Sequence, residues 1–190
     1  IFAACSLLIS IPLAFYYTFA NLFLNELGMV GAASKMTIGQ VSEVFFMALM
    51  PFFFRRLGVK WMLLVGMLAW VVRYALFSAG DMDSLSWMIY GGIILHGVCY
   101  DFFFVTGQVY VDKKASAEIR SSAQSFITLL TYGFGLAIGT MLSGRVIDAL
   151  TTDGVRDWST IWMIPGIFAA VIAVIFFFTF NENEKAKEVD

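Results

Sequence analysis

The chain has 190 residues, of which 60% are hydrophobic and 17% aromatic, and its mean hydropathy is +0.82. Only 14% of the residues are charged, whereas a soluble globular domain carries about 25%. This composition excludes an ordinary soluble domain and indicates a protein that crosses a membrane several times. The net charge of −2 decides little, because the placement of Lys and Arg in such proteins matters more than their sum.

Apolar segments of about 20 residues, the length of a membrane-spanning helix, follow one another along the chain. Strands are excluded because lipid cannot satisfy open backbone groups and the alternation of a membrane barrel is absent from the sequence. We therefore predict an all-α membrane protein with a six-helix transmembrane bundle over residues 1–180 and a polar tail over 181–190. The six segments are Ile1–Phe23, Met36–Phe54, Trp61–Ala79, Trp87–Val109, Ala123–Ile147 and Ser159–Phe180.

The basic residues predict how this bundle is oriented. Most of them lie in the second and fourth connections and in the tail, which are expected to face the cytoplasm because Lys and Arg favour that side. Both ends of the chain are then cytoplasmic. The chain starts at Ile1 without a methionine, so we expect it to be a piece of a longer protein. The cations on the cytoplasmic side are Arg55, Arg56, Lys60, Lys113, Lys114, Arg120, Lys185 and Lys187.

Several polar side chains interrupt the first three segments. Tyr17 and Asn21 are four residues apart and Gln40 and Glu43 are three apart, so each pair shares a helix face. Tyrosines near a membrane boundary are often only interfacial anchors, and a buried Glu can serve packing alone. Apolar groups would pack at a lower free-energy cost, which favours a functional role for Glu43. Arg73 is expected to extend its side chain outward or to pair with Glu43 or another buried acid.

The fourth segment, HGVCYDFFFVTGQVYVD, is the most informative stretch of the chain. His96 and Tyr100 share one helix face, and Asp101 follows directly. A carboxylate in the middle of an apolar span costs about 3 kcal/mol on insertion scales, so such a residue indicates function. Burial disfavours the charged form of a carboxyl group, which suits a group that binds and releases a proton. Asp101 is the first candidate for proton coupling and Glu43 the second.

The fifth segment combines a row of small residues with a polar edge at Gln124 and Thr128 that could reach an inward-facing cavity, and close packing is its main expected role. Gly135, Gly139 and Ser143 are spaced four apart in the fifth segment and allow another helix to approach closely. The sixth segment is uniformly apolar apart from Pro165–Gly166 and is expected to be peripheral. Polar groups therefore concentrate on segments one, two, four and five, a layout that suits a 3+3 inverted repeat in which every third helix is scaffold.

Five stretches together resemble the nucleoside:proton symporter family of the major facilitator superfamily, in its C-terminal six-helix half. The connection after the second segment is similar to the superfamily's loop motif at Arg56, Gly58 and Lys60, although Arg55 replaces the expected acid. The helix-four stretch is the specific one. The five stretches are IGQVSE, RRLGVKWMLL, AWVVRYALF, HGVCYDFFFVTGQVYVD and RSSAQSFITLLTYGFGLAIG.

The resemblance implies proton-coupled import of nucleosides across a bacterial inner membrane, by alternating access between this half and an N-terminal six-helix half. It implies no catalytic residue, metal or cofactor, with the proton as coupling ion, and no nucleic-acid partner. The partners would be the nucleoside, the lipid bilayer and the other half, without which the chain should not transport. The resemblance implies Gln40, Glu43, His96 and Tyr100 as substrate-binding residues and Asp101 as the proton-coupling residue. The chemistry of the residues adds Tyr17 to the substrate-binding set and Glu43 as the second proton-coupling candidate.

Elementary chemistry supports these assignments. A nucleoside is neutral, so its hydroxyls need amide and carboxylate partners and its flat base needs aromatic faces. A sugar or oligosaccharide:proton symporter is the nearest alternative, since it shares the fold and also uses buried carboxylates. An intramembrane aspartyl protease is disfavoured because GFGLAIG contains no second acid, and MLSGR matches a serine protease poorly. A packing or receptor subunit would leave Glu43 and Asp101 without a role.

Overall fold

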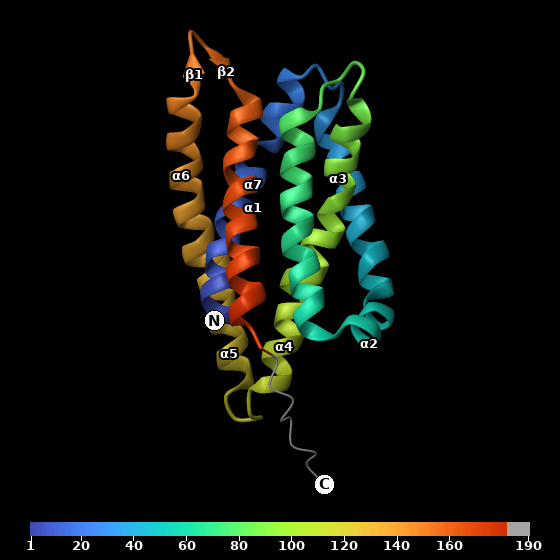
Figure 1. Ribbon diagram of the computed structural model, residues 1–190, viewed down its shortest axis with the longest axis vertical. Helices are drawn as coiled ribbons and strands as arrows, with labels where there is room; N and C mark the ends of the chain where they lie inside the picture. The colour runs from blue at the N-terminus through green and yellow to red at the C-terminus, as the bar shows by residue number, and fades with distance from the viewer. Residues whose placement is uncertain (182–190) are drawn as a thin grey trace.

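The computed structural model describes residues 1–181, in which helices pack side by side along one long axis (Figure 1). The all-α prediction is confirmed, apart from one very short hairpin. All but the first residue of the predicted tail, 181–190, lies outside the described residues. The elements are α1 (Phe2–Glu26), α2 (Ala32–Ala79), α3 (Ser86–Tyr100), η1 (Asp101–Val105), α4 (Thr106–Lys114), α5 (Arg120–Thr128), η2 (Leu129–Gly135), α6 (Leu136–Ala149), β1 (Thr151–Thr152), β2 (Val155–Arg156) and α7 (Trp158–Thr179).

Five helical stretches in the described part of the chain are long and apolar enough to cross a membrane, where the sequence predicted six. The difference arises because two predicted segments fall within the single element α2. Residues in α3, η1 and α4 form one continuous stretch, and so do those in α5, η2 and α6. The five stretches are Phe2–Glu26, Ala32–Ala79, Ser86–Lys114, Arg120–Ala149 and Trp158–Thr179.

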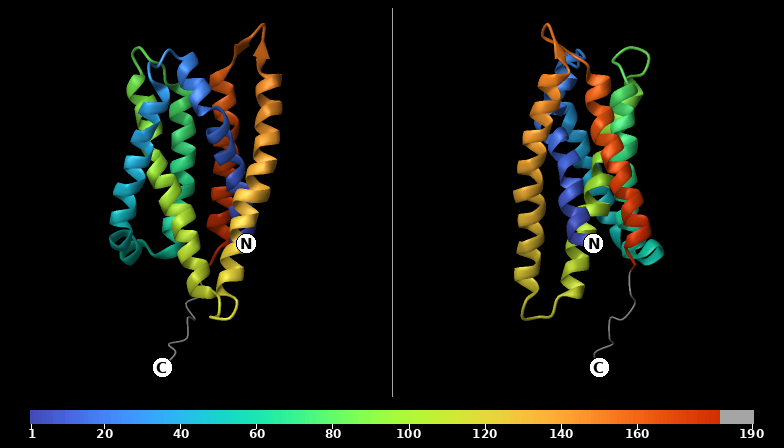
Figure 2. Two further views of the ribbon diagram at one scale, coloured as in Figure 1. Left: turned by 180° about the vertical axis from the view of Figure 1, so that it is seen from behind. Right: turned by 60° about the vertical axis from the view of Figure 1, so that its left-hand side comes forward.

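The long element α2 changes direction at Gly58. Its 48 residues would measure about 72 Å as a straight helix, more than twice the apolar thickness of a bilayer. Gly58 adopts φ 71° and ψ 177°, in the region that glycine occupies without strain because it lacks a Cβ. Figures 1 and 2 show the chain reversing there, at the end of the bundle where α1 begins and α7 ends. We call residues 32–57 the first arm of α2 and residues 59–79 the second arm.

Two of the membrane-length stretches contain π-helical turns, which the sequence analysis did not predict. The segment η1 separates α3 from α4, and η2 separates α5 from α6. Such turns are rare and occur frequently at functional sites, because the extra residue widens the helix and redirects nearby side chains. The predicted proton-coupling residue, Asp101, is the first residue of η1.

The hairpin connects α6 to α7 at the opposite end of the bundle from Gly58. Its strands are antiparallel, with Thr152 opposite Val155. Asp153 and Gly154 form the turn and have φ values of 52° and 80°. Positive φ at both central residues fits the right-handed twist of a two-residue hairpin, and Asp-Gly is a preferred sequence for it.

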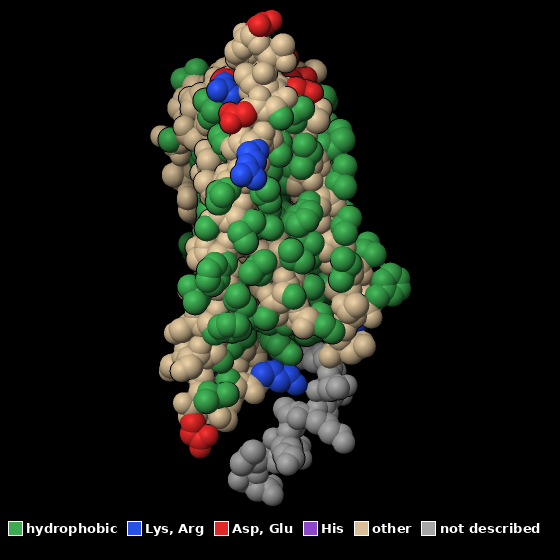
Figure 3. Space-filling model, turned by 90° about the vertical axis from the view of Figure 1, so that its left-hand side faces the viewer, with side chains coloured by type: hydrophobic (Ala, Val, Ile, Leu, Met, Phe, Trp, Pro, Cys, Tyr) green, Lys and Arg blue, Asp and Glu red, His purple; other side chains and the backbone are tan. Residues whose placement is uncertain are grey.

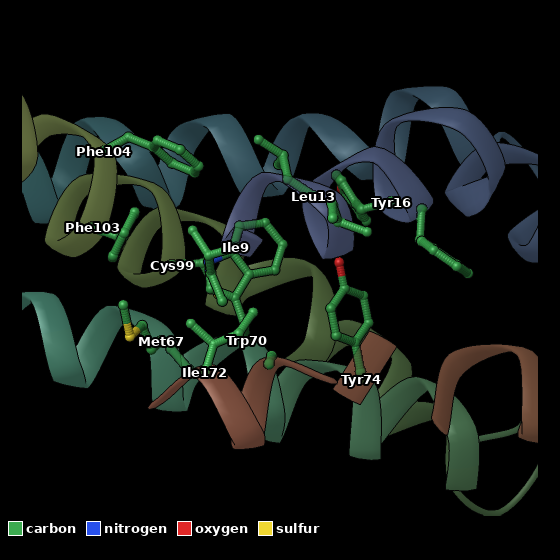
Figure 4. Packing of buried hydrophobic residues seen from close by; sticks show 14 of the residues in the cluster. Ile9, Leu13, Tyr16, Met67, Trp70, Tyr74, Cys99, Phe103, Phe104 and Ile172 are labelled. Carbon is green, nitrogen blue, oxygen red and sulfur yellow. The ribbon is translucent and has the colours of Figure 1, made fainter. Parts of the chain in front are cut away.

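The hydrophobic core lies between α1, the second arm of α2, α3 and α7. Trp70, Tyr74 and Trp162 are each 0% exposed, and the Tyr74 and Trp162 rings stack with centroids 5.5 Å apart. The Tyr74 hydroxyl donates a hydrogen bond of 2.5 Å to the carbonyl oxygen of Pro12, and Figure 4 shows it directed toward α1. This contact fixes the second arm against the first helix.

The surface pattern suits a lipid environment. Figure 3 shows apolar side chains over the middle of one face, with charged side chains gathered toward the two ends. Large apolar residues such as Val72, Val171 and Phe178 are 50%, 52% and 74% exposed. A soluble monomer rarely exposes contiguous apolar surface of this kind. The composition and the exposed surface therefore agree that the bundle lies in a membrane.

Candidate functional site

The site is built where the first arm of α2 packs closely against α3. A Cβ atom at Gly97 would lie 2.5 Å from the backbone carbon of Ser42, and one at Gly39 would lie 3.1 Å from the Cβ of His96. The Ser42 hydroxyl also donates a 2.6 Å hydrogen bond to the carbonyl oxygen of Ile94. Because glycine allows this approach, the polar faces of the two helices meet.

Glu43 and His96 come together across this contact. The distance from His96 Nε2 to Glu43 Oε2 is 3.7 Å, and the two side chains are 7% and 24% exposed. Gln40, one turn from Glu43, is exposed. Gln40 and Glu43 are three residues apart in one helix and therefore share a face, as predicted. His96 lies beside the Glu43 carboxylate.

The other nitrogen of His96 contacts Arg73. Arg73 Nη1 lies 3.1 Å from His96 Nδ1, and the side chain is 0% exposed. The guanidinium carbon lies 3.5 Å from the centre of the Tyr16 ring, which stacks on the His96 ring with centroids 5.4 Å apart. The expectation that Arg73 extends outward is wrong, because packing of the second arm against α1 and α3 encloses it. Its partner is the histidine rather than an acid.

Aromatic residues extend the site toward η2. The His96 and Tyr100 ring centroids are 5.9 Å apart, and the Tyr132 hydroxyl donates a 2.7 Å hydrogen bond to the Tyr100 hydroxyl. Tyr17 is 49% exposed and lies beside Tyr16 on α1. Tyr132 and Tyr16 were not among the predicted site residues. Tyr132 lies in TLLTYGFG, where one tyrosine between threonines and glycines gives no signal of its partner.

Asp101 directly follows Tyr100, but its carboxyl group makes no hydrogen bond to the other groups of the site. It is 0% exposed, and neither carboxylate oxygen has a hydrogen-bond partner within residues 1–181. Its backbone carbonyl accepts a 3.1 Å hydrogen bond from the Thr106 hydroxyl. The second arm of α2 packs on η1 through Gly66, whose Cβ would lie 2.8 Å from the Phe103 nitrogen. Asp101 is thus a buried carboxyl group without a structural partner in this part of the chain.

The three residues of the predicted loop motif lie at the end of the bundle, away from the site. Gly58 forms the turn described above. The Arg56 guanidinium lies 4.7 Å from the centre of the Phe52 ring, and the Lys60 ammonium lies 5.5 Å from that of Phe177. These cations contact aromatic rings at the bundle end.

An open cavity of about 600 Å³ lies along α5 and η2. Two hydrogen bonds connect residues that line the cavity to α4. The Gln108 amide donates to the Thr128 hydroxyl at 3.3 Å, and the Gln124 amide donates to an Asp112 carboxylate oxygen at 3.3 Å. Within the described residues, no group of three or more His, Cys, Asp or Glu is placed to hold a metal ion. The cavity is lined by Ser121, Gln124, Ser125, Thr128, Leu129, Tyr132 and Gly133.

The fold and the site together define a polytopic membrane protein in which charged and aromatic groups meet between tightly packed helices. Such intramembrane groups mark substrate and ion pathways in transporters. The model of the family described as nucleoside H+ symporter matches residues 1–185. The chain belongs to this family.

Known relatives agree with this assignment. The chain is 42% identical to YegT of Escherichia coli K12, over 97% of this chain and 45% of that protein. It is 36% identical to the xanthosine permease of the same organism, over 81% of this chain and 37% of the permease. The crystal structure of the nucleoside transporter NupG superposes with a TM-score of 0.86 at 33% identity, covering 95% of this chain and 48% of NupG. The chain thus spans about half the length of the curated relatives it matches.

Proposed function

We propose that the chain is the C-terminal half of a transporter that imports nucleosides together with protons. Family membership supports the reaction, and the 48% coverage of NupG supports the division into two halves. The two arms of α2, counted separately, would give six membrane crossings arranged as two groups of three. Apart from Arg73, which lies on the third crossing, the polar residues of the site lie on the first two crossings of each group, which supports a 3+3 inverted repeat.

The single observation that carries the proposal is the Glu43–His96 contact at 3.7 Å, beside the Tyr100 and Tyr132 rings. Carboxylate, imidazole and the amide of Gln40 suit the ribose hydroxyls, and exposed aromatic faces such as that of Tyr17 suit the base. The N-terminal half would supply the opposite wall of the site. Substrate would bind between the halves and be released by alternating access.

Proton coupling is assigned to Asp101, with Glu43 as the second candidate. An unpaired carboxylate buried in an apolar bundle is costly when charged and much less so when neutral. Binding a proton would therefore change which conformation of the helices around η1 is favoured, and this is how an ion drives a conformational equilibrium. The π-helical turn gives this part of the chain a helix geometry that differs from its surroundings.

The orientation follows from the cations at the Gly58 end. We assign this end, with the start of α1 and the end of α7, to the cytoplasmic side of a bacterial inner membrane. Arg56, Lys60 and Lys113 all lie over aromatic rings there.

Competition uptake in cells that express the full-length parent tests the substrate class. Labelled uridine should be displaced by unlabelled uridine, adenosine or xanthosine and not by lactose. Labelled lactose uptake without uridine uptake would favour a sugar:proton symporter instead.

A further inference from the structure

Arg73 is the one buried Lys or Arg side chain in the described helices, and it contacts a histidine. A guanidinium group has only N–H donors and remains charged in proteins. Arg73 Nη1 lies 3.1 Å from His96 Nδ1, so Nδ1 must be the acceptor in this contact. A neutral imidazole carries one proton, and that proton therefore resides on Nε2.

Nε2 faces the carboxylate of Glu43. At 3.7 Å, His96 Nε2 and Glu43 Oε2 are too far apart for a direct hydrogen bond. The N–H group and the carboxylate oxygen are therefore neighbours that can each still form a hydrogen bond to a third group. A hydroxyl group both donates and accepts, and it matches such a pair. The groups around the imidazole are Arg73 and Glu43 from the two arms of α2, Tyr16 from α1 and Tyr100 from α3.

We propose that Arg73 is a positioning residue that holds His96 as its Nε2–H form and so creates, with Glu43, a receptor for one ribose hydroxyl. This inference rests on the proposed function for the identity of the ligand, but not for the state of the histidine. A second proton on Nδ1 would place N–H against N–H, so His96 serves as a fixed donor rather than as a proton carrier.

The stacking around Arg73 supports this positioning role. The Tyr16 ring centre lies 3.5 Å from the guanidinium carbon of Arg73 and 5.4 Å from the centre of the His96 ring, so one aromatic ring contacts both groups of the pair. Figure 4 shows Tyr16 on α1 with Trp70 and Tyr74 on the second arm of α2. The Trp70 ring centre lies 5.5 Å from the guanidinium carbon. Arg73 Nε and Nη2 have no hydrogen-bond partner within residues 1–181, and the Cys99 thiol lies near the guanidinium, so the imidazole is the nitrogen acceptor that Arg73 contacts.

The state of His96 is measured directly by nitrogen NMR on the full-length parent with ¹⁵N-labelled histidine. The His96 signals are assigned by their loss in His96→Asn. The expected spectrum shows a protonated Nε2 and an unprotonated Nδ1 across about pH 5–8, the range in which histidines ordinarily titrate. A protonated Nδ1, alone or together with Nε2, would overturn the proposal.

The consequence for the ligand is measured as a ratio of affinities, which does not depend on how much protein folds. The purified parent should bind uridine about tenfold more tightly than either 2′-deoxyuridine or 3′-deoxyuridine, whichever lacks the recognised hydroxyl. In Arg73→Met, and in His96→Phe as an independent variant, the ratio should fall toward one. Arg145→Met, which removes an exposed cation of α6, should leave the ratio unchanged.

The outcomes separate the two claims. An unchanged ratio in both Arg73→Met and His96→Phe would overturn the hydroxyl receptor even if uridine is bound. A parent that binds no nucleoside, with His96 in the Nε2–H form, would overturn the proposed function and the ligand assignment but not the positioning by Arg73. A structural role alone would lower the amount of folded protein and leave the ratio intact.

Discussion

Arg73 and Asp101 are buried groups of opposite charge, and their surroundings differ. Both are 0% exposed, and removing a single charge from water costs several kcal/mol. Two contacts offset part of this desolvation cost for Arg73. The Tyr16 ring forms a cation–π contact, which contributes about 2 kcal/mol when desolvated, and His96 accepts a hydrogen bond. Asp101 has no such compensation within the described residues. The lack of a partner therefore points to a group that changes protonation state, because packing alone would favour an apolar side chain.

Replacing Glu43 tests the binding role at this scale. Glu43→Gln keeps the side-chain shape but exchanges one carboxylate oxygen for an N–H donor, which cannot accept from a substrate hydroxyl. We expect uridine affinity in the full-length parent to fall about tenfold, the value of one hydrogen bond to a charged group. Equilibrium binding to purified protein measures this. Glu118→Gln, in the loop between α4 and α5, is the matched control, and equal affinities of the two variants would remove Glu43 from the site.

Sequence patterns predicted which residues share a helix face, whereas the roles of these residues in the site stay predictions. Gln40 and Glu43, and His96 and Tyr100, were recognised because helix spacing places them on shared faces. Arg73 was recognised as unusual, but its partner was not. Which residues meet between helices depends on how far one helix slides along another, and here Gly39 and Gly97 set that position. Glycine spacing indicates close packing without naming the neighbour.

At the scale of elements, the α2–α3 contact controls the position of Glu43. A Cβ at Gly97 would lie 2.5 Å from the Ser42 backbone carbon and 2.6 Å from the Glu43 nitrogen. Gly97→Ala must therefore shift the first arm of α2. We expect a loss of about 1–3 kcal/mol in stability together with weaker uridine binding, because backbone atoms cannot move aside as a flexible side chain would.

Thermal unfolding of the detergent-solubilised parent measures the Gly97→Ala effect. Gly144→Ala is the control, since nothing lies within 4 Å of a Cβ built there on α6. It should be neutral or slightly stabilising, because alanine is the better helix former. Equal melting temperatures for the two variants would show that the helices are not as close as described.

The Tyr132–Tyr100 hydrogen bond links the two stretches that contain π-helical turns. Its hydroxyls are 2.7 Å apart, and it holds Tyr100 toward the site. We expect Tyr132→Phe and Tyr100→Phe each to weaken uridine binding by about 1 kcal/mol, and the double variant to lose no more than one of them, because they remove the same bond. Strictly additive losses would contradict the link. Tyr90→Phe, on α3 beside Lys35, serves as the uncoupled partner for comparison.

Among the elements, the sequence predicted the helices and the break at Gly58, because apolar runs and a glycine between cations are local features. The π-helical segments η1 and η2 were missed. A widened turn depends on what packs against it, as Gly66 packs against η1, and this information is not present in the local sequence.

For the whole molecule, the orientation assigned from the cations leads to a labelling prediction. Cys5 and Cys99 are both buried, so they should react little with a membrane-impermeant maleimide. In a full-length parent without its other cysteines, Asp153→Cys at the hairpin should react in intact cells. Ser116→Cys, between α4 and α5, should react only in inverted vesicles. The reverse pattern would place the Gly58 end outside.

The central claim is that the whole transporter couples nucleoside import to a proton through Asp101. The most direct test is labelled uridine uptake by cells that express the full-length parent, with and without a protonophore, beside Asp101→Asn and the surface control Asp153→Asn. The account predicts that the protonophore abolishes accumulation by the parent and by Asp153→Asn, and that Asp101→Asn accumulates no uridine although its purified form still binds it. Accumulation by Asp101→Asn that matches the parent and still responds to the protonophore would contradict the assignment of coupling to Asp101.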